Sequence, residues 1–165
     1  TMKVNGLTLA PSADFTSYLY AGQSLTLQQE QSFSTALQYG GAIALGLGSV
    51  ASGAAASSLG DYSIATGYNA MAIGASSLAL GPQTVANTAD AIAVGDMANA
   101  GGSSAIAVGA SANASGIVSM AQGNGATASG DYSAAFGMNA QAAGPGSAAL
   151  GGGARSEERR GGDRC

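Results

Sequence analysis

The chain has 165 residues, only 8% of them charged, and a formal net charge of −4 at pH 7. It contains 27 glycines, one cysteine and no histidine or tryptophan. The absence of histidine and the scatter of the few acids argue against acid–base catalysis, a bound metal or a cofactor, and the acidic balance argues against nucleic acid as a partner. We therefore expect a protein that is not an enzyme.

The first forty residues differ from the rest of the chain. Residues 1–40 hold five of the nine aromatic side chains, and the segments 7–9, 18–20 and 25–27 have the alternation of short strands. Stacked repeat arrays need atypical terminal units to cover an open sheet edge. We therefore expect an N-terminal cap or an irregular first coil here. A separate aromatic ligand site is the alternative.

Glycine then recurs at every seventh position from Gly46 to Gly151, and only Thr88 departs from the series. Two kinds of heptad alternate, so the repeating unit has fourteen residues. One kind ends in a small-large-Ala-large-Gly block, as in residues 105–109, and the other is made almost wholly of small residues, as in 112–116. The first kind recurs every fourteen residues between Gly67 and Gly151. Twenty-one residues separate Gly46 from Gly67, which predicts an extra heptad in one coil. The turn glycines predicted for the first kind are Gly67, Gly81, Gly95, Gly109, Gly123, Gly137 and Gly151.

A fourteen-residue unit is too short for a helical repeat, which needs about thirty residues or more. Alternation with period two, bounded by glycine, predicts two short strands and two tight turns per unit. Successive units then stack at about 4.8 Å. The fold class is therefore all-β, a parallel β-roll (solenoid) of about eight fourteen-residue coils within residues 41–154. Asparagine also tolerates the positive φ of tight turns, and Asn99, Asn113, Asn124 and Asn139 are expected to lie near the turns.

The alternation also predicts which residues face inward. Alanine always lies two residues before the glycine of the first kind of heptad, and alanine or serine lies four residues before it. These small residues share one strand face and suit a thin interior. The large apolar residues on the other face are then exposed, and we expect them to pack between copies of the chain. The alternative is a monomer with a fatter roll and the large residues inside. The predicted subunit-interface residues are Ile43, Leu45, Ile64, Leu78, Leu80, Ile92, Val94, Ile106 and Val108.

Other motifs carry less weight. Residues 46–51 and 123–128 fit a dinucleotide-binding fingerprint, but the glycine repeat generates such matches by itself. Asp61 and Asp131 occupy equivalent places in two Gly-Asp-Tyr-Ser tetrapeptides and are expected to be turn residues.

Three tyrosines, Tyr62, Tyr68 and Tyr132, offer either exposed binding patches or ordinary surface packing. No run of about twenty uninterrupted apolar residues is present in the sequence, so we expect no direct membrane insertion by this segment.

The last eleven residues, 155–165, hold four of the five basic residues and the single cysteine, Cys165. One terminal cysteine cannot form an internal disulfide framework. A short charged, glycine-rich segment of this kind is expected to be a disordered tail. The stretch 155–160, Arg-Ser-Glu-Glu-Arg-Arg, also matches what a common sequencing adapter encodes, so the tail is expected to be non-native.

The repeats resemble those of a known family. Residues 105–116 and 130–137, with copies in register between about residues 40 and 155, are similar to the head repeats of YadA-like trimeric autotransporter adhesins. The resemblance implies a left-handed parallel β-roll and a homotrimer on the bacterial cell surface. It further implies attachment to host extracellular matrix, cell-surface proteins or other bacteria. The neck, stalk and membrane anchor of that family have no counterpart in the sequence, so outer-membrane anchoring is expected through parts outside this chain.

Phage tail proteins carry similar repeats, so a structural module of a phage tail or surface appendage, with no adhesive role, is the alternative. An ice-binding solenoid would need a regular row of threonines, and Thr66, Thr84, Thr88 and Thr127 form none.

Overall fold

The computed structural model describes residues 2–4, 7–11, 18–20, 23–24 and 41–157. The first four segments form a four-stranded antiparallel sheet in the order β1-β2-β3-β4. Two of the three expected N-terminal strands are confirmed, while the third, at 25–27, lies outside the described residues. A capping role for residues 1–40 stays a prediction. The strands are β1 (Met2–Val4), β2 (Leu7–Pro11), β3 (Tyr18–Tyr20) and β4 (Gln23–Ser24).

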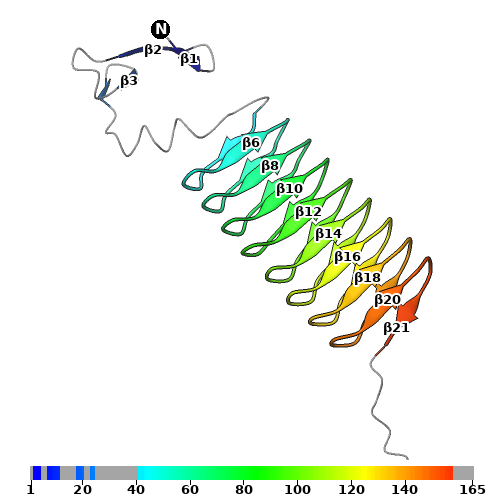
Figure 1. Cartoon of the computed structure of the whole chain (residues 1–165). Coiled ribbons are helices and arrows are strands. Elements are labelled where there is room, and N and C mark those ends of the chain that lie inside the picture. Colours follow the sequence, from blue (N-terminus) through cyan, green and yellow to red (C-terminus); the bar gives the residue numbers. More distant parts are fainter. Residues whose placement is uncertain (1, 5–6, 12–17, 21–22, 25–40, 158–165) are drawn as a thin grey trace, which may run out of the picture.

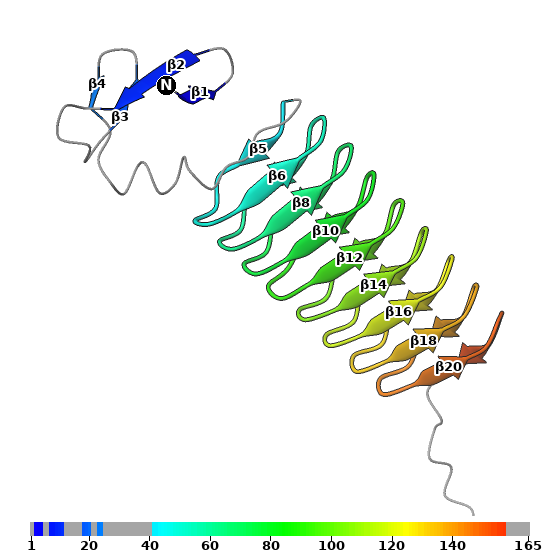
Figure 2. The same ribbon diagram turned by 45° about the horizontal axis from the view of Figure 1, so that its top comes forward.

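Residues 41–157 form a stack of thin coils, and both sheets of this roll are parallel (Figures 1 and 2). One sheet has eight strands and the other nine. The eight-stranded sheet consists of β6 (Val50–Ser52), β8 (Ile64–Thr66), β10 (Leu78–Leu80), β12 (Ile92–Val94), β14 (Ile106–Val108), β16 (Met120–Gln122), β18 (Ala134–Phe136) and β20 (Ala148–Leu150). The nine-stranded sheet consists of β5 (Ile43–Ala44), β7 (Ser57–Ser58), β9 (Met71–Ala72), β11 (Val85–Ala86), β13 (Asn99–Ala100), β15 (Asn113–Ala114), β17 (Thr127–Ala128), β19 (Gln141–Ala142) and β21 (Arg155–Ser156).

Each strand pairs with the strand fourteen residues further along, for example Ile92 with Ile106. The same register holds at the start of the roll, where Val50 pairs with Ile64 and Ile43 with Ser57. The prediction of an extra heptad between Gly46 and Gly67 was therefore wrong. We call the three-residue strands of the eight-stranded sheet the long strands. Residues 42–46 have the composition of a long strand, but the pairing of Ile43 with Ser57 places them in the nine-stranded sheet.

The C-terminal limit of the roll also needs correction. Arg155 and Ser156, expected at the start of a disordered tail, form β21 and pair with Gln141 and Ala142 of β19. The roll thus extends at least two residues beyond the predicted boundary at 154. Residues 158–165 lie outside the described part of the chain.

The interior contains only small side chains, as the alternation predicted. Four inward columns run along the stack, two from each sheet, and alanine dominates three of them. Thr84 is the largest fully buried side chain among the described residues. Alanine buries little apolar area, so the continuous hydrogen bonds between coils contribute a large part of the cohesion.

The fourth inward column is mostly serine, and its hydroxyls are not equally satisfied. Ser63 donates from Oγ to the carbonyl of Gly60 at 2.6 Å, and its Oγ lies 2.6 Å from Oγ of Ser58. By contrast, the buried Oγ atoms of Ser77 and Ser119 have no hydrogen-bond partner. Alanine already occupies this column at Ala91 and Ala105, where it is fully buried.

We therefore expect Ser119→Ala to leave the free energy of unfolding unchanged or slightly higher, because it removes a buried hydroxyl without a partner. Ser63→Ala should instead destabilise the roll by about 1 kcal/mol, since it breaks two hydrogen bonds and leaves Ser58 unpaired. Urea denaturation of both variants checks the pair. Equal losses in the two variants would contradict the difference in hydrogen bonding.

The turns share one backbone geometry. The carbonyl of the first turn residue accepts the N–H of the fourth, as from Ala112 to Gly109 at 3.2 Å, and the third residue has a positive φ. A positive φ at this position is typical of type II turns. Asn139 occupies it, with φ 55°. Asn99 and Asn113 lie near turns but in strands, and Asn124 is the second residue of its turn.

Close approach of successive coils explains the glycine at the first position of each turn. A Cβ at Gly109 would lie 2.6 Å from the carbonyl oxygen of Gly123, and one at Gly102 would overlap the carbonyl of Gly116. The predicted turn glycines, including Gly109 with φ 132°, also have a positive φ, which side chains other than glycine disfavour. Thr88, which departs from the series, donates its hydroxyl to the carbonyl of Gly102 at 2.7 Å.

Candidate interaction surface

The outward face of the eight-stranded sheet carries two rows of mostly large apolar side chains. Its two outward rows come from the first and third residues of each strand. The interior is filled by alanine, serine and one threonine, so the alternative of a fatter roll with the large residues inside was wrong. We call this outward set the apolar ladder: Ile64, Leu78, Leu80, Ile92, Val94, Ile106 and Val108.

Two residues predicted for the same surface lie elsewhere. Ile43 belongs to β5 of the nine-stranded sheet, and Leu45 follows that strand. Val50 of β6 takes the equivalent place above Ile64. The grouping of Ile43 and Leu45 with the ladder was therefore wrong, although both side chains are exposed.

Beyond the ladder, two levels of the sheet pair a small outward residue with a large one. These are Ala134 with Phe136 in β18 and Ala148 with Leu150 in β20. Small and large residues at one level suggest that both rows fill a common space. Such volume compensation is a property of packed cores.

The outward face of the nine-stranded sheet is different because its character changes along the stack. It begins with apolar residues such as Met71 and Val85, then becomes polar from Asn99 onward. Nδ2 of Asn99 donates to Oδ1 of Asn113 at 3.1 Å. The eight-stranded sheet is thus the one whose apolar face continues through the middle coils.

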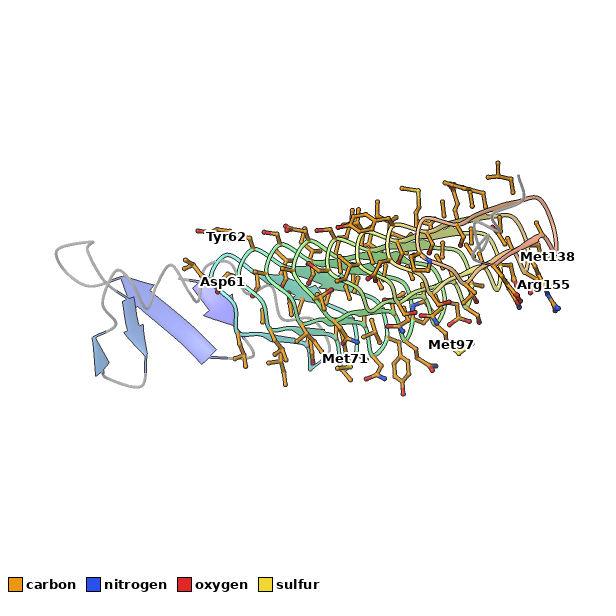
Figure 3. The ribbon with its side chains drawn as sticks, turned by 90° about the horizontal axis from the view of Figure 1, so that it is seen from below. Asp61, Tyr62, Met71, Met97, Met138 and Arg155 are labelled. Atoms are coloured by element: carbon orange, nitrogen blue, oxygen red, sulfur yellow. The ribbon has the colours of Figure 1, made fainter. Side chains whose placement is uncertain are left out.

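The turns form the two edges of the roll. We call the edge made by the turns that lead into the long strands the Asp–Tyr edge, because Asp61, Tyr62, Asp131 and Tyr132 lie on it. Figure 3 shows Asp61 and Tyr62 together on one side of the stack, with Met97 on the other side. The opposite edge, made by the turns that follow the long strands, carries Tyr68, Asp96, Met97 and Met138.

The two aspartates were predicted to be turn residues, and the structure adds a specific contact. Oδ1 of Asp61 accepts the N–H of Leu47 at 2.8 Å, and Oδ1 of Asp131 accepts that of Ile117 at 2.9 Å. Each bond links the aspartate to the turn of the preceding coil. This contact could not be seen in the sequence because it joins residues fourteen positions apart.

The neighbouring tyrosines project into solvent. Tyr62 is 65% exposed and Tyr132 69% exposed, while Tyr68 on the opposite edge is 60% exposed. Such large exposed aromatic side chains are typical of surfaces that make contacts.

Within the described ranges, no group of three or more histidine, cysteine, aspartate or glutamate side chains could hold a metal ion. The same part of the chain contains no helix long and apolar enough to cross a membrane.

A parallel roll with an alanine interior and an outward apolar face defines a class of stacked repeat proteins that act through extended surfaces. The family model described as the YadA head domain repeat matches residues 41–70, 72–98 and 114–140, just over half of the chain. The chain therefore belongs to the YadA head domain family. A search of curated proteins gave no match.

Proposed function

We propose that the chain is the head of a homotrimeric surface adhesin and that the apolar ladder lies at the subunit interface. The observation that carries this proposal is the placement of the ladder outside an interior that alanine already fills. A cyclic trimer could bury the ladder along its whole length if the symmetry axis runs parallel to the stack. Burying each large side chain would contribute about 1.5–3 kcal/mol.

The size compensation between Ala134 and Phe136 supports the same arrangement. Around a three-fold axis, the two outward residues of each level share one central space, so a large residue in one row fits where the other row is small. A monomer would impose no such relation between two solvent-facing rows.

The family supports a role in adhesion at the bacterial surface, with anchoring to the outer membrane through other parts of the protein. Host extracellular matrix and cell-surface proteins are the proposed ligands. We propose that the chain acts by binding and not by catalysis, because it has no histidine and its few acidic residues are scattered along the sequence. Binding by an extended repetitive surface is the usual mode of stacked repeat proteins.

Two measurements test the proposal. Equilibrium sedimentation of the chain at about 10–50 μM, a range in which an interface of several buried apolar residues per subunit should be populated, is expected to give three times the monomer mass of 15.7 kDa. Beads coated with the trimer should adhere to matrix proteins or cultured cells more than beads coated with a dissociated variant. A monomeric wild-type chain would contradict the trimer. A trimer without adhesion would favour a structural module of a phage tail or surface appendage.

A further inference from the structure

The Asp–Tyr edge contains the same arrangement of residues twice. In both copies, an exposed tyrosine follows an aspartate whose Oδ1 is held by the N–H of an exposed apolar residue, Leu47 or Ile117. The third-position φ is 55° at Tyr62 and 57° at Tyr132, so the backbone presents the two rings in the same way. The copies are therefore geometrically equivalent sites on one edge.

The distance between the copies follows from the stacking. Asp61 and Asp131 are five coils apart, which at about 4.8 Å per coil separates the sites by about 24 Å. At the position of the tyrosines, the turns between them carry Ser76, Asp90, Ser104 and Val118, all smaller than tyrosine. An extended ligand could lie along this edge and reach both tyrosines.

The charge of the edge selects the ligand. Asp61, Asp90 and Asp131 all lie on it and are exposed, and the only basic residue of the described roll, Arg155, lies in the nine-stranded sheet instead. Each exposed ring thus stands beside a carboxylate with no basic side chain on the same edge. An aromatic face next to a carboxylate suits a lysine or arginine side chain, which can stack on the ring and pair with the acid.

A neutral sugar fits the edge less well. Aromatic rings also stack on sugars, but specific recognition needs several polar groups around the ring. Here Oδ1 of each aspartate is already engaged by a backbone N–H, and the turns between the copies offer few polar side chains besides short hydroxyls and Asp90.

We propose that the Asp–Tyr edge binds an extended polypeptide segment through two basic side chains about 24 Å apart. An extended chain advances about 3.4 Å per residue, so the two basic residues would be about seven positions apart. This inference rests on the proposed adhesive function and names the chemical class of its ligand. Each site alone would be weak, and the affinity would come from engaging both sites of one edge.

The test uses the full chain and two synthetic peptides of equal charge. In the first, two arginines lie seven positions apart in a neutral serine- and threonine-rich sequence, and in the second they are adjacent. Isothermal titration calorimetry or fluorescence anisotropy should show the spaced peptide binding roughly tenfold or more tighter than the adjacent one, since only the spaced peptide gains from the effective concentration at the second site. Binding should weaken as salt rises from about 50 to 500 mM, because the Debye length shortens over this range.

Substitutions locate the site. Tyr62→Ala and Tyr132→Ala should each lower the affinity for the spaced peptide to about that for the adjacent peptide, and Asp61→Asn with Asp131→Asn should weaken the salt dependence of binding. Tyr68→Ala and Asp96→Asn are the matched controls because they remove the same side chains from the opposite edge, and they should leave binding unchanged. Circular dichroism of each variant checks that the roll remains folded.

Several outcomes would overturn the inference. These are equal affinity for the two peptides, equal losses from the edge variants and their controls, and salt-independent binding of neutral oligosaccharides in place of the peptide. If Tyr62→Ala or Tyr132→Ala lowers the mass measured by sedimentation, the tyrosines lie in the subunit interface and the inference is wrong. If the trimer is intact and adheres to its targets but does not bind the spaced peptide, the inference is wrong and the proposed adhesin function is unaffected.

Discussion

The double substitution Ile92→Asp with Ile106→Asp should convert the assembly into monomers. The two isoleucines occupy neighbouring levels of the apolar ladder and pair in register. Loss of each buried side chain removes about 1.5–3 kcal/mol of association free energy per subunit, and a carboxylate at an apolar interface adds a desolvation cost. Equilibrium sedimentation measures the change in mass, and circular dichroism should show an unchanged sheet content because no turn glycine or inward residue is altered.

The matched control is Asn99→Asp with Asn113→Asp. These asparagines lie outward on two adjacent coils of the nine-stranded sheet, so the control introduces the same charges at the same spacing on the polar face. It should remain trimeric. Dissociation of both variants would indicate a general charge effect, and dissociation of neither would exclude the ladder as the subunit interface.

A methyl group at Gly102 should destabilise the roll severely, while one at the adjacent Gly101 should be tolerated. A Cβ at Gly102 would overlap the backbone carbonyl of Gly116 in the next coil, whereas a Cβ at Gly101 would have its nearest neighbour at 3.8 Å. Relief of the overlap requires separating two coils and stretching their hydrogen bonds. We expect Gly102→Ala to lower the free energy of unfolding by about 3 kcal/mol or more.

Urea or guanidinium denaturation followed by circular dichroism checks this pair. Gly101→Ala should be neutral or raise stability by up to about 1 kcal/mol, because alanine restricts the unfolded chain more than glycine. Similar losses in the two variants would show that flexibility of the glycine pair, and not the approach of the coils, sets the requirement at this position.

The period of the roll could be predicted because each coil imposes the same steric demand on the chain. Where successive turns approach, as at Gly109 and Gly123, a Cβ would overlap the next coil. The demand for glycine recurs every seven residues, with Thr88 as the exception. The inward and outward rows could be predicted for a similar reason, since a strand alternates its faces. Both signals can be read within one repeat of the sequence.

The sequence pattern misleads where the assignment of a residue to a sheet or a turn depends on the neighbouring coil. Residues 42–46 have the composition of a long strand, and only the pairing of Ile43 with Ser57 reveals that they belong to the other sheet. Asn99 and Asn113 suit a turn by propensity, but the register places them in strands, where their side chains hydrogen-bond to each other. Propensity was outweighed by tertiary context in both cases.

The candidate surface was predicted only in part. The exposure of the apolar ladder followed from the size of the residues on the two strand faces. The link from Asp61 to Leu47 and its duplicate at Asp131 did not follow, because a carboxylate in a turn can accept a hydrogen bond from several nearby amides. The stacking of one turn directly on the next selects the amide of the preceding coil.

The pairing of every strand with the one fourteen residues later has a consequence for how the molecule is made. Contacts so close along the sequence impose little loop-closure entropy, so folding need not wait for distant segments to meet. A nascent or translocating chain could add one coil at a time to a growing end, with each new coil using the previous one as its template. The length of the molecule would then change by whole coils through gain or loss of fourteen codons, and the sequences of the neighbouring coils would not need to change.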